Sequence, residues 1–154
     1  MKPFLTFFIF FIYTLCFGFT ITADASHSHA YIIIDRNTQQ LHYLENNKVQ
    51  RSFHVTTGKP QTPTPAGSFK VVYKEENRPY YKANISGGSP KNPLGSRWIG
   101  LDVNHSTGNV YGIHGTNQPG TIGLKVSNGC IRMKNSDVEW LYPKAHLGMK
   151  VIIR

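Results

Sequence analysis

Apolar and polar residues alternate in short stretches along most of this chain. A leading apolar run over residues 4–19 comes first. Residues 31–34 are a β-branched run, residues 40–44 alternate polar and apolar side chains, and residues 49–56 continue as a further extended stretch. A period of two is typical of strands that bury one face. The pattern therefore predicts a β-rich domain behind an apolar leader.

Turn residues separate the predicted strands. Asn46 and Asn47 lie between the second and third stretches, and asparagine tolerates the positive φ that a tight hairpin requires. The opening is therefore predicted to be a small meander of strands. Four further strands are predicted over residues 68–74, 98–103, 109–114 and 148–153.

Helical signals are few. Residues 136–139 (SDVE) have capping-box spacing ahead of Trp140 and Leu141, and Pro143 ends that segment. Residues 121–126 have room for one helical turn. The fold predicted is a single, mostly β domain: a sandwich or partial barrel of short strands with one or two short helices.

Two polar stretches interrupt the strands. Residues 58–67 hold three prolines, which remove backbone donors and fix φ, so neither a helix nor a central strand is expected there. Residues 75–97 form a long polar connection, and connections of this length inside a compact domain are commonly lids or binding loops. A tolerated surface insertion is the alternative that the sequence leaves open.

The leader has the parts of a secretory signal peptide. Lys2 supplies the positive start, residues 4–19 the apolar core, and Ala23 and Ala25 the small residues before a cleavage site. Residues 1–25 are therefore predicted to be a signal peptide, and residues 26–154 an exported domain of the cell wall, periplasm or surroundings. An uncleaved anchor is the alternative. The apolar run of sixteen residues falls short of the roughly 20 that a spanning helix needs.

The chain is strongly basic, and loss of the leader does not change this. The formal net charge is +9, and residues 1–25 carry one Lys2 and one Asp24, so the remainder keeps +9. A basic surface attracts polyanions, which outside a cell are anionic wall polymers or membrane surfaces, not nucleic acid. The basic residues are scattered, so general solubility is an equally good explanation.

Cys130 is the single cysteine of the predicted mature domain, because Cys16 lies in the leader. A lone cysteine in an exported protein is either an inert small hydrophobe or a reactive thiol. Its neighbours favour a reactive thiol, since Gly129 lets the backbone approach another group closely and Ser127 and Asn128 are polar. On these residues alone the two interpretations carry equal weight.

A reactive thiol needs a base or a positive charge beside it, and histidine is the usual one. His114 is the best candidate of seven, because it ends a predicted strand, precedes Gly115 and Thr116, and lies sixteen residues before Cys130. The other histidines lie near the predicted new N-terminus, within strands or in turns: His27, His29, His42, His54, His105 and His146.

Acyl transfer also needs donors for the oxyanion that forms on the attacked carbonyl. Backbone N–H groups at Asn128, Gly129 and Cys130 are the natural candidates. Arg132 shares the face of Cys130 if this segment is extended, and its guanidinium could then hold a substrate carboxylate. A solvated surface charge is the alternative for Arg132.

Metal and cofactor sites find little support. Catalytic zinc needs three protein ligands, and beyond His114 and Cys130 no third ligand stands at a telling spacing. The sequence has no CxxC, HxxxH, phosphate-binding glycine loop or nucleotide fingerprint. The sequence therefore predicts neither a metal nor a cofactor.

The motifs YGIHGT (residues 111–116) and SNGCIRM (residues 127–133) together closely resemble the signature of the L,D-transpeptidase catalytic domain family, which is YkuD-like. That signature is a His-Gly pair, a short span, and then Ser-His/Asn-Gly-Cys-hydrophobic-Arg. Residues 62–69 (TPTPAGSF) are similar to the family's TPxGxF segment, and residues 98–101 (WIGL) also match. The resemblance covers nearly all of the predicted mature domain.

The resemblance implies a β-rich fold and a cysteine that becomes acylated by the stem peptide of peptidoglycan. It implies that Cys130 is the nucleophile and His114 the general base and acid, with the Gly115 carbonyl orienting the imidazole. It also implies an oxyanion hole in the backbone around Gly129 and Cys130.

Three further positions of the motif bear on the substrate. Arg132 matches the family arginine near the site, and Ser127 is expected beside it as a substrate-binding residue. Asn128 stands where many members carry histidine, so no second titrating group is expected at that position.

The implied activity is transfer of an acyl group from a tetrapeptide donor to an amine, with release of the terminal D-residue, in wall crosslinking or remodelling. Two alternatives stay open. An L,D-carboxypeptidase would use the same site with water as the acceptor, and a non-catalytic wall-binding module would keep only the fold.

Overall fold

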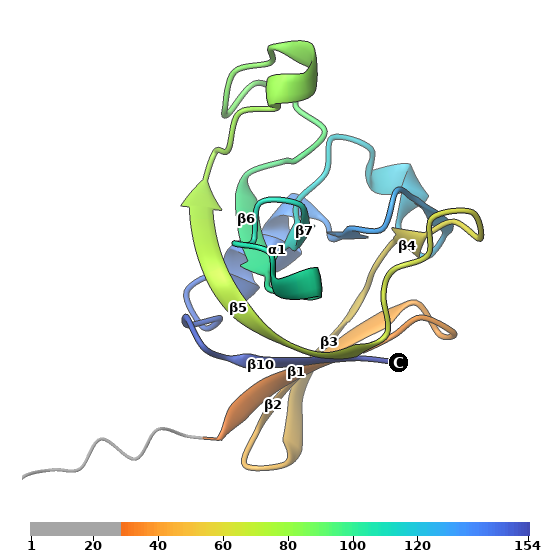
Figure 1. Cartoon of the computed structure of the whole chain (residues 1–154), viewed down its shortest axis with the longest axis vertical. Coiled ribbons are helices and arrows are strands. Elements are labelled where there is room, and N and C mark those ends of the chain that lie inside the picture. The colour runs from red at the N-terminus through yellow and green to blue at the C-terminus, as the bar shows by residue number, and fades with distance from the viewer. Residues whose placement is uncertain (1–28) are drawn as a thin grey trace, which may run out of the picture.

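The computed structural model describes residues 29–154, so the predicted signal peptide, residues 1–25, lies outside the described residues. Residues 29–154 form ten strands, one α-helix and three short 3₁₀ turns (Figure 1). In chain order the elements are β1 Ala30–Asp35, β2 Gln40–Glu45, β3 Lys48–His54, β4 Thr57–Gly58, β5 Gly67–Glu76, η1 Tyr81–Ala83, β6 Arg97–Leu101, η2 Val103–His105, β7 Tyr111–His114, η3 Pro119–Thr121, β8 Lys125–Ser127, β9 Ile131–Arg132, α1 Asn135–Leu141 and β10 Lys150–Ile153.

Eight strands form one sheet in the order β3-β2-β1-β10-β5-β6-β7-β9, while β4 and β8 form a separate parallel pair. The predicted meander is confirmed, since β1, β2 and β3 pair in antiparallel succession. Asn46 and Asn47 have φ values of 50° and 62°, the consecutive positive-φ residues of a tight hairpin turn. Strand β10 lies between β1 and β5 and runs parallel to β1, so the end of the chain joins the two halves of the sheet.

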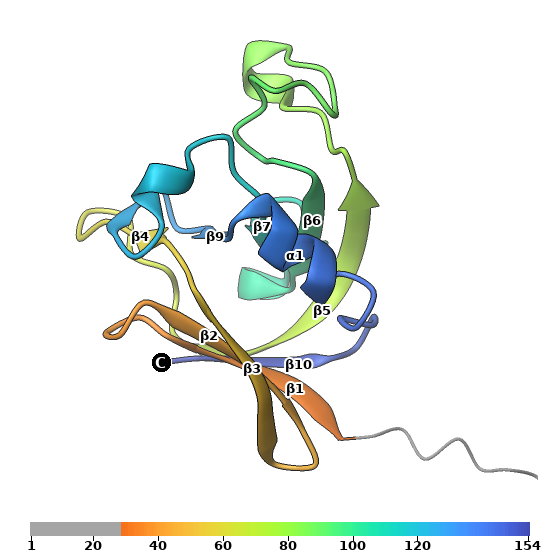
Figure 2. The same cartoon turned by 180° about the vertical axis from the view of Figure 1, so that it is seen from behind.

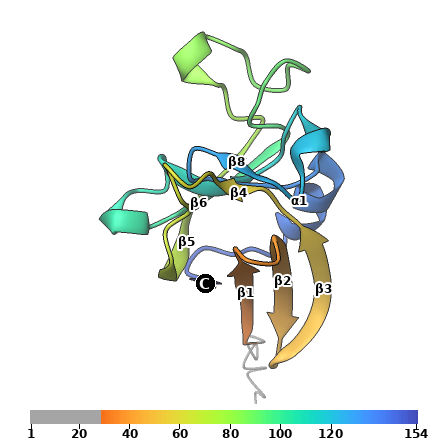
Figure 3. The same ribbon diagram turned by 90° about the vertical axis from the view of Figure 1, so that its right-hand side faces the viewer.

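The sheet curls into a half-barrel at β5. This strand spans ten residues, and its pairing with β6 shifts register between Val71 and Tyr73. A bulge of this kind bends a strand and increases its twist, and β5 sweeps through an arc in Figure 1. Figure 3 shows the meander β1–β3 on one side of the domain and β4 and β8 on the other. The prediction of one mostly β domain is confirmed, and the partial barrel is the alternative that the chain adopts.

The core lies between the curled sheet and α1. Val138 and Leu141 of α1 are fully buried and join one hydrophobic cluster with sheet residues that include Ile99, Ile113 and Ile131. In Figure 2 the helix lies in front of β6 and β7, which it contacts. Full burial of one such side chain contributes roughly 1.5–3 kcal/mol. Since α1 follows β9 closely in the chain, its packing holds the segment that contains the cysteine motif against the sheet.

Two local predictions are wrong. Residues 121–126 do not form a helical turn, because η3 ends at Thr121 and residues 125–127 are the strand β8, paired with β4. The predicted short helix is present and ends before Pro143, but its predicted start is wrong: the N-cap is Lys134, which makes no side-chain capping bond, and Ser136 lies inside α1. No helix within residues 29–154 is long and apolar enough to cross a membrane.

Strands β7 and β9 bring the two sequence motifs together. They pair in parallel, with Ile113 opposite Ile131 and His114 opposite Arg132. Alternate residues of a strand share a face, so this register puts His114 and Arg132 on one face of the sheet. Cys130, two residues before Arg132, stands at the entrance to β9 on the same side.

Candidate active site

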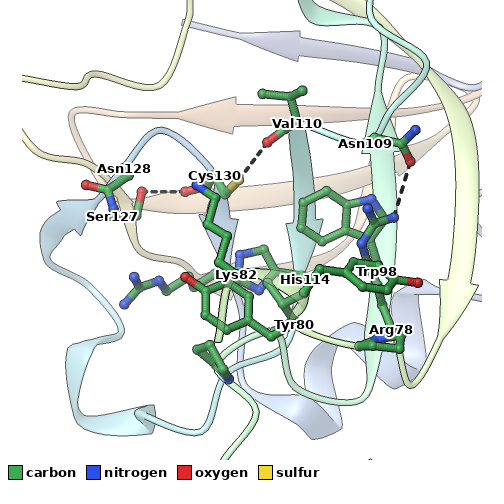
Figure 4. A pocket seen from close by; sticks show the side chains of 15 residues that line it. Arg78, Tyr80, Lys82, Trp98, Asn109, Val110, His114, Ser127, Asn128 and Cys130 are labelled. Carbon is green, nitrogen blue, oxygen red and sulfur yellow. Dashed lines mark hydrogen bonds between the residues drawn. The ribbon is translucent and has the colours of Figure 1, made fainter. Parts of the chain in front are cut away.

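Cys130, His114 and Arg132 line one cavity of about 310 Å³. Figure 4 shows this cavity, hereafter the thiol pocket, with Cys130 and His114 among its lining side chains. One wall comes from β7, β9 and the turn at residues 127–130, and the other from the loop between β5 and β6. The long polar connection over residues 75–97 therefore forms part of the site, as a binding loop would.

The thiol of Cys130 is half-buried in this pocket. Its Sγ donates to the backbone oxygen of Val110 at 3.4 Å, and no hydrogen bond within residues 29–154 joins it to His114. Burial raises the pKa of the Cys130 thiol, against the opposing effects of the Gly112 backbone and of the nearby cations, Arg132 first among them. The resting group is therefore a neutral thiol, not a thiolate.

His114 is buried at the end of β7, with 4% of its surface exposed. Its Nδ1 lies 2.6 Å from the carbonyl oxygen of Gly115. A carbonyl only accepts, so Nδ1 carries the hydrogen and Nε2 is left as the basic nitrogen. Burial lowers the pKa of His114 to about 4, opposed by the carbonyls of Gly115 and Leu94 and reinforced by Arg132. The imidazole is thus neutral at physiological pH and competent to accept a proton.

Trp98 stacks on the imidazole of His114, a contact that the sequence pattern did not indicate. The ring centroids lie 5.3 Å apart with 17° between the planes. The contact follows from register, because Trp98 of β6 stands directly opposite His114 of β7. Trp98 is itself fixed, since its Nε1 donates to the carbonyl oxygen of Gly108 at 2.8 Å. The base therefore rests against a rigid aromatic face.

The turn before β9 is closed by Ser127. Its buried Oγ donates to the carbonyl oxygen of Cys130 at 2.6 Å and accepts from the N–H of Gly129 at 3.2 Å. Ser127 also lines the thiol pocket, so its substrate-binding role stays a prediction, although its one hydroxyl donor is already used within the turn. Ser127 instead sets the shape of the loop that holds the thiol.

Gly129 is required in this turn by its conformation and its surroundings. Its φ is +113°, and a Cβ there would lie 2.9 Å from a ring carbon of Tyr111. The predicted set of oxyanion donors narrows, because the Gly129 N–H is held by Ser127. The backbone N–H groups of Asn128 and Cys130, two residues that line the pocket, are the predicted donors that this arrangement leaves.

Arg132 lines the thiol pocket from a rigid position. Its backbone N–H and carbonyl both pair with Thr56 at 2.9 Å. Its side chain is half-buried, and none of the ion pairs among residues 29–154 involves it. The backbone of Arg132 is fixed, and its guanidinium lines the pocket without an ion-pair partner among residues 29–154. This placement fits the predicted binding of a substrate carboxylate.

Asn135 holds the chain directly after His114, and sequence reasoning missed it. Its Oδ1 accepts from the backbone N–H of Thr116 at 3.1 Å and of Ser96 at 3.3 Å. A Cβ at Gly115 or at Gly95 would come within 2.2 Å of this oxygen. Gly95 and Gly115 were the available signal, because a glycine often lies where another group closely approaches the backbone. The sequence does not indicate that the approaching group is the side chain of Asn135.

The chemistry of the donor set does not suggest a metal site. Across residues 29–154, no three His, Cys, Asp or Glu side chains gather as ligands of one ion. The arrangement instead offers a thiol, a neutral imidazole with a defined basic nitrogen, and cations. That combination suits nucleophilic acyl transfer.

A comparison with protein families decides the relationship. The model of the YkuD family, the L,D-transpeptidase catalytic domain, matches residues 29–153. The chain belongs to the L,D-transpeptidase catalytic domain family. The match covers every element of the half-barrel and every residue of the thiol pocket.

Individual members of this family support the assignment. The chain is 48% identical over 123 residues to YqjB of Bacillus subtilis, which is named as an L,D-transpeptidase, and covers 70% of that protein. The solution structure of the catalytic domain of the E. faecium L,D-transpeptidase matches 81% of this chain with a TM-score of 0.63 and 30% identity, over 96% of that domain. The Ldtfm–avibactam carbamoyl enzyme matches 82% of this chain with a TM-score of 0.64 and 30% identity, over 49% of its own length.

Proposed function

We propose that this chain is an exported cysteine L,D-transpeptidase that acts on peptidoglycan stem peptides through an acyl-enzyme on Cys130. The observation that carries the proposal is the presence of Cys130, His114 and Arg132 in one pocket, on the strands that bear the family's two motifs. The carbamoyl enzyme named for a relative of 30% identity is further support, since it is a covalent adduct of the same fold.

The first half of the proposed reaction starts from a neutral pair. The Cys130 thiol turns from the Val110 carbonyl toward Nε2 of His114, which takes its proton as the sulfur attacks the donor's carbonyl carbon. An S–C bond forms and the carbonyl electrons move onto oxygen, where backbone N–H groups at the turn stabilise them. Collapse of this intermediate breaks the C–N bond, and His114 returns the proton to the departing amine.

The second half of the reaction releases the acyl group. An acceptor amine attacks the thioester, His114 takes the proton of that amine, and the sulfur leaves and regains a proton from the imidazolium. Water in place of the amine would give hydrolysis, which is the L,D-carboxypeptidase alternative. Membership of the L,D-transpeptidase family favours the amine over water as the acyl acceptor.

A product assay tests the choice of acceptor. The protein without residues 1–25 is incubated with a tetrapeptide donor and an excess of a second stem peptide with a free amine. We expect a crosslinked dimer and the released D-residue. Free tripeptide without any dimer would instead establish the carboxypeptidase.

Export is proposed on the leader alone. Cleavage after Ala25 would leave Ser26 as the first residue, and wall substrates lie outside the membrane. Mass spectrometry of the protein recovered from outside the producing cells tests this. A protein that starts at Met1 or stays in the cytoplasm would contradict export while leaving the enzymatic proposal intact.

A further inference from the structure

The wall of the thiol pocket that faces the cysteine motif is an ordered loop over residues 77–96, hereafter the pocket loop. Buried Asn92 ties it together, because its Nδ2 donates to the carbonyl oxygens of Arg78 at 2.8 Å and Ser86 at 3.3 Å. Tyr80 and Ile85 pair across η1 through two backbone hydrogen bonds. The short turn η1, Tyr81–Ala83, is therefore held in place above the pocket.

Among residues 29–154, the side chains that line the thiol pocket include three cations and no carboxylate. The cations are Arg78, Lys82 and Arg132. Arg78 is already engaged, with an ion pair to Glu75 at 3.2 Å, a hydrogen bond to Asn109 at 3.3 Å and its guanidinium 4.9 Å from the Trp98 ring centre. Lys82 belongs to none of the ion pairs found among residues 29–154.

Lys82 faces the reacting atom. Its exposed side chain extends from η1 toward Cys130 in Figure 4, and its charge is among those that favour the thiolate form of Cys130. The ammonium and the sulfur therefore line the same pocket, in which a donor must present its scissile carbonyl. A lysine in this place can bind an anion of the substrate as a charge-assisted hydrogen-bond donor.

We propose that Lys82 is a specificity-determining residue that binds the carboxylate at the end of the leaving D-residue; this rests on the function proposed above. Among the carboxylates of a stem peptide, that one is separated from the scissile carbonyl by a single residue. Lys82 and Arg132 line the pocket from different walls, the β5–β6 loop and β9. We assign the terminal carboxylate to Lys82, which leaves Arg132 for another carboxylate of the stem peptide. The pocket loop would thus select donors with one residue beyond the scissile bond and a free terminal carboxylate.

Another role for Lys82 makes a different prediction. If the ammonium served only to stabilise the thiolate, its removal would slow every reaction of Cys130, whatever the charge of the partner. Alkylation by iodoacetamide, which is neutral, measures that effect separately. Binding of a carboxylate affects only donors that carry it.

The test compares two tetrapeptide donors that differ only in a free or an amidated terminal carboxylate. Acylation of Cys130 is followed by intact-protein mass for the parent, for Lys82→Gln and for Lys91→Gln. Lys91 is an exposed lysine of the same loop whose side chain lines no part of the thiol pocket, so its replacement is a charge-matched control. Lys82→Arg keeps the charge and should keep the preference in large part.

We expect the parent and Lys91→Gln to acylate with the free carboxylate at least tenfold faster than with the amide, the lower end of the range for a charged hydrogen bond. Lys82→Gln should lose this preference. Any slowing caused by the lost charge beside the thiol should be equal for the amide and for iodoacetamide, and smaller than the slowing with the free carboxylate. An undiminished preference in Lys82→Gln would overturn the proposal, and so would an equal slowing of both donors and of alkylation. If neither donor acylates the parent, the proposed function itself fails.

Discussion

At the scale of single residues, the site holds an uncharged thiol beside an uncharged imidazole. Burial moves both pKa values in the directions that oppose a thiolate–imidazolium pair: that of Cys130 is raised and that of His114 falls to about 4. The sequence alone predicted a reactive thiol with His114 as its base, and did not indicate the resting charge of either group. The structure instead favours proton transfer at the moment of attack, with the donor bound.

The protonation state of Cys130 is measurable through its alkylation rate. Because only the thiolate reacts well and burial raises the pKa of this thiol, the rate with iodoacetamide should rise roughly tenfold for each pH unit and still be rising at about pH 9. Cys130→Ala supplies the blank. A plateau that begins near neutral pH would show a preformed thiolate instead.

The depressed pKa of His114 also predicts how stability depends on pH. The unfolded chain takes up a proton on His114 near pH 6.5, whereas the folded chain does so only near pH 4. The contribution of His114 to stability is therefore full above pH 6.5, falls as the pH drops from 6.5 to 4, and is lost below that. The loss attributable to this group is about 3 kcal/mol.

Urea unfolding of the parent and of His114→Gln at several pH values between 7 and 4 isolates this contribution. Glutamine does not titrate, so the difference between the two proteins removes the effect of the carboxylates that they share. The difference should shrink as the pH falls. A difference that is independent of pH would mean that His114 is not held neutral by burial.

At the scale of elements, the turn before β9 is sensitive to substitution at Gly129. Gly129→Ala puts a Cβ at a positive φ and against the ring of Tyr111, which should cost about 1–2 kcal/mol of folding stability and slow acylation. Gly120→Ala is the matched control, because a Cβ at Gly120 meets no atom within 4 Å. Equal unfolding midpoints for the two variants would contradict this account of the turn.

Much of the strand pattern could be predicted because alternation and turn residues are local signals. Asn46 and Asn47 predicted the first hairpin turn. The glycine-flanked run before His114 predicted that this residue lies at the end of a strand. The strand β8 could not be predicted, since three residues at an edge carry no period of their own. The error at α1 has a similar origin, because the oxygen of Asn135 bonds across to Ser96 and Thr116 and does not cap its own helix.

The parts of the site that sequence reasoning missed all depend on tertiary placement. Trp98 meets His114 only because β6 and β7 pair in that register. Lys82 enters the thiol pocket because Asn92 folds the pocket loop back on itself. The spacing of residues along the chain reveals neither the contact of Trp98 with His114 nor the place of Lys82 in the pocket. Cys130 and His114, by contrast, are recognisable from their sequence motifs alone.

At the scale of the whole molecule, the chain has a formal net charge of +9, and its thiol pocket is also lined by cationic side chains. If anionic wall polymers are partners, their binding should be strong near 10 mM salt, where the Debye length is about 30 Å, and weak above 150 mM, where it is about 8 Å. Sedimentation with purified wall fragments over this range measures it. Binding that does not respond to salt would leave solubility as the explanation of the charge.

The central claim is that the sulfur of Cys130 carries an acyl fragment of a stem peptide, delivered with the help of His114. The most direct measurement is an intact-protein mass spectrum taken seconds to minutes after mixing with a tetrapeptide donor. We predict a gain in mass equal to the mass of the donor minus that of the free D-amino acid that leaves. This adduct should be absent in Cys130→Ala and should form about 10²–10⁴ times more slowly in His114→Ala. An unchanged mass in the parent, or the same adduct in Cys130→Ala, would contradict the account.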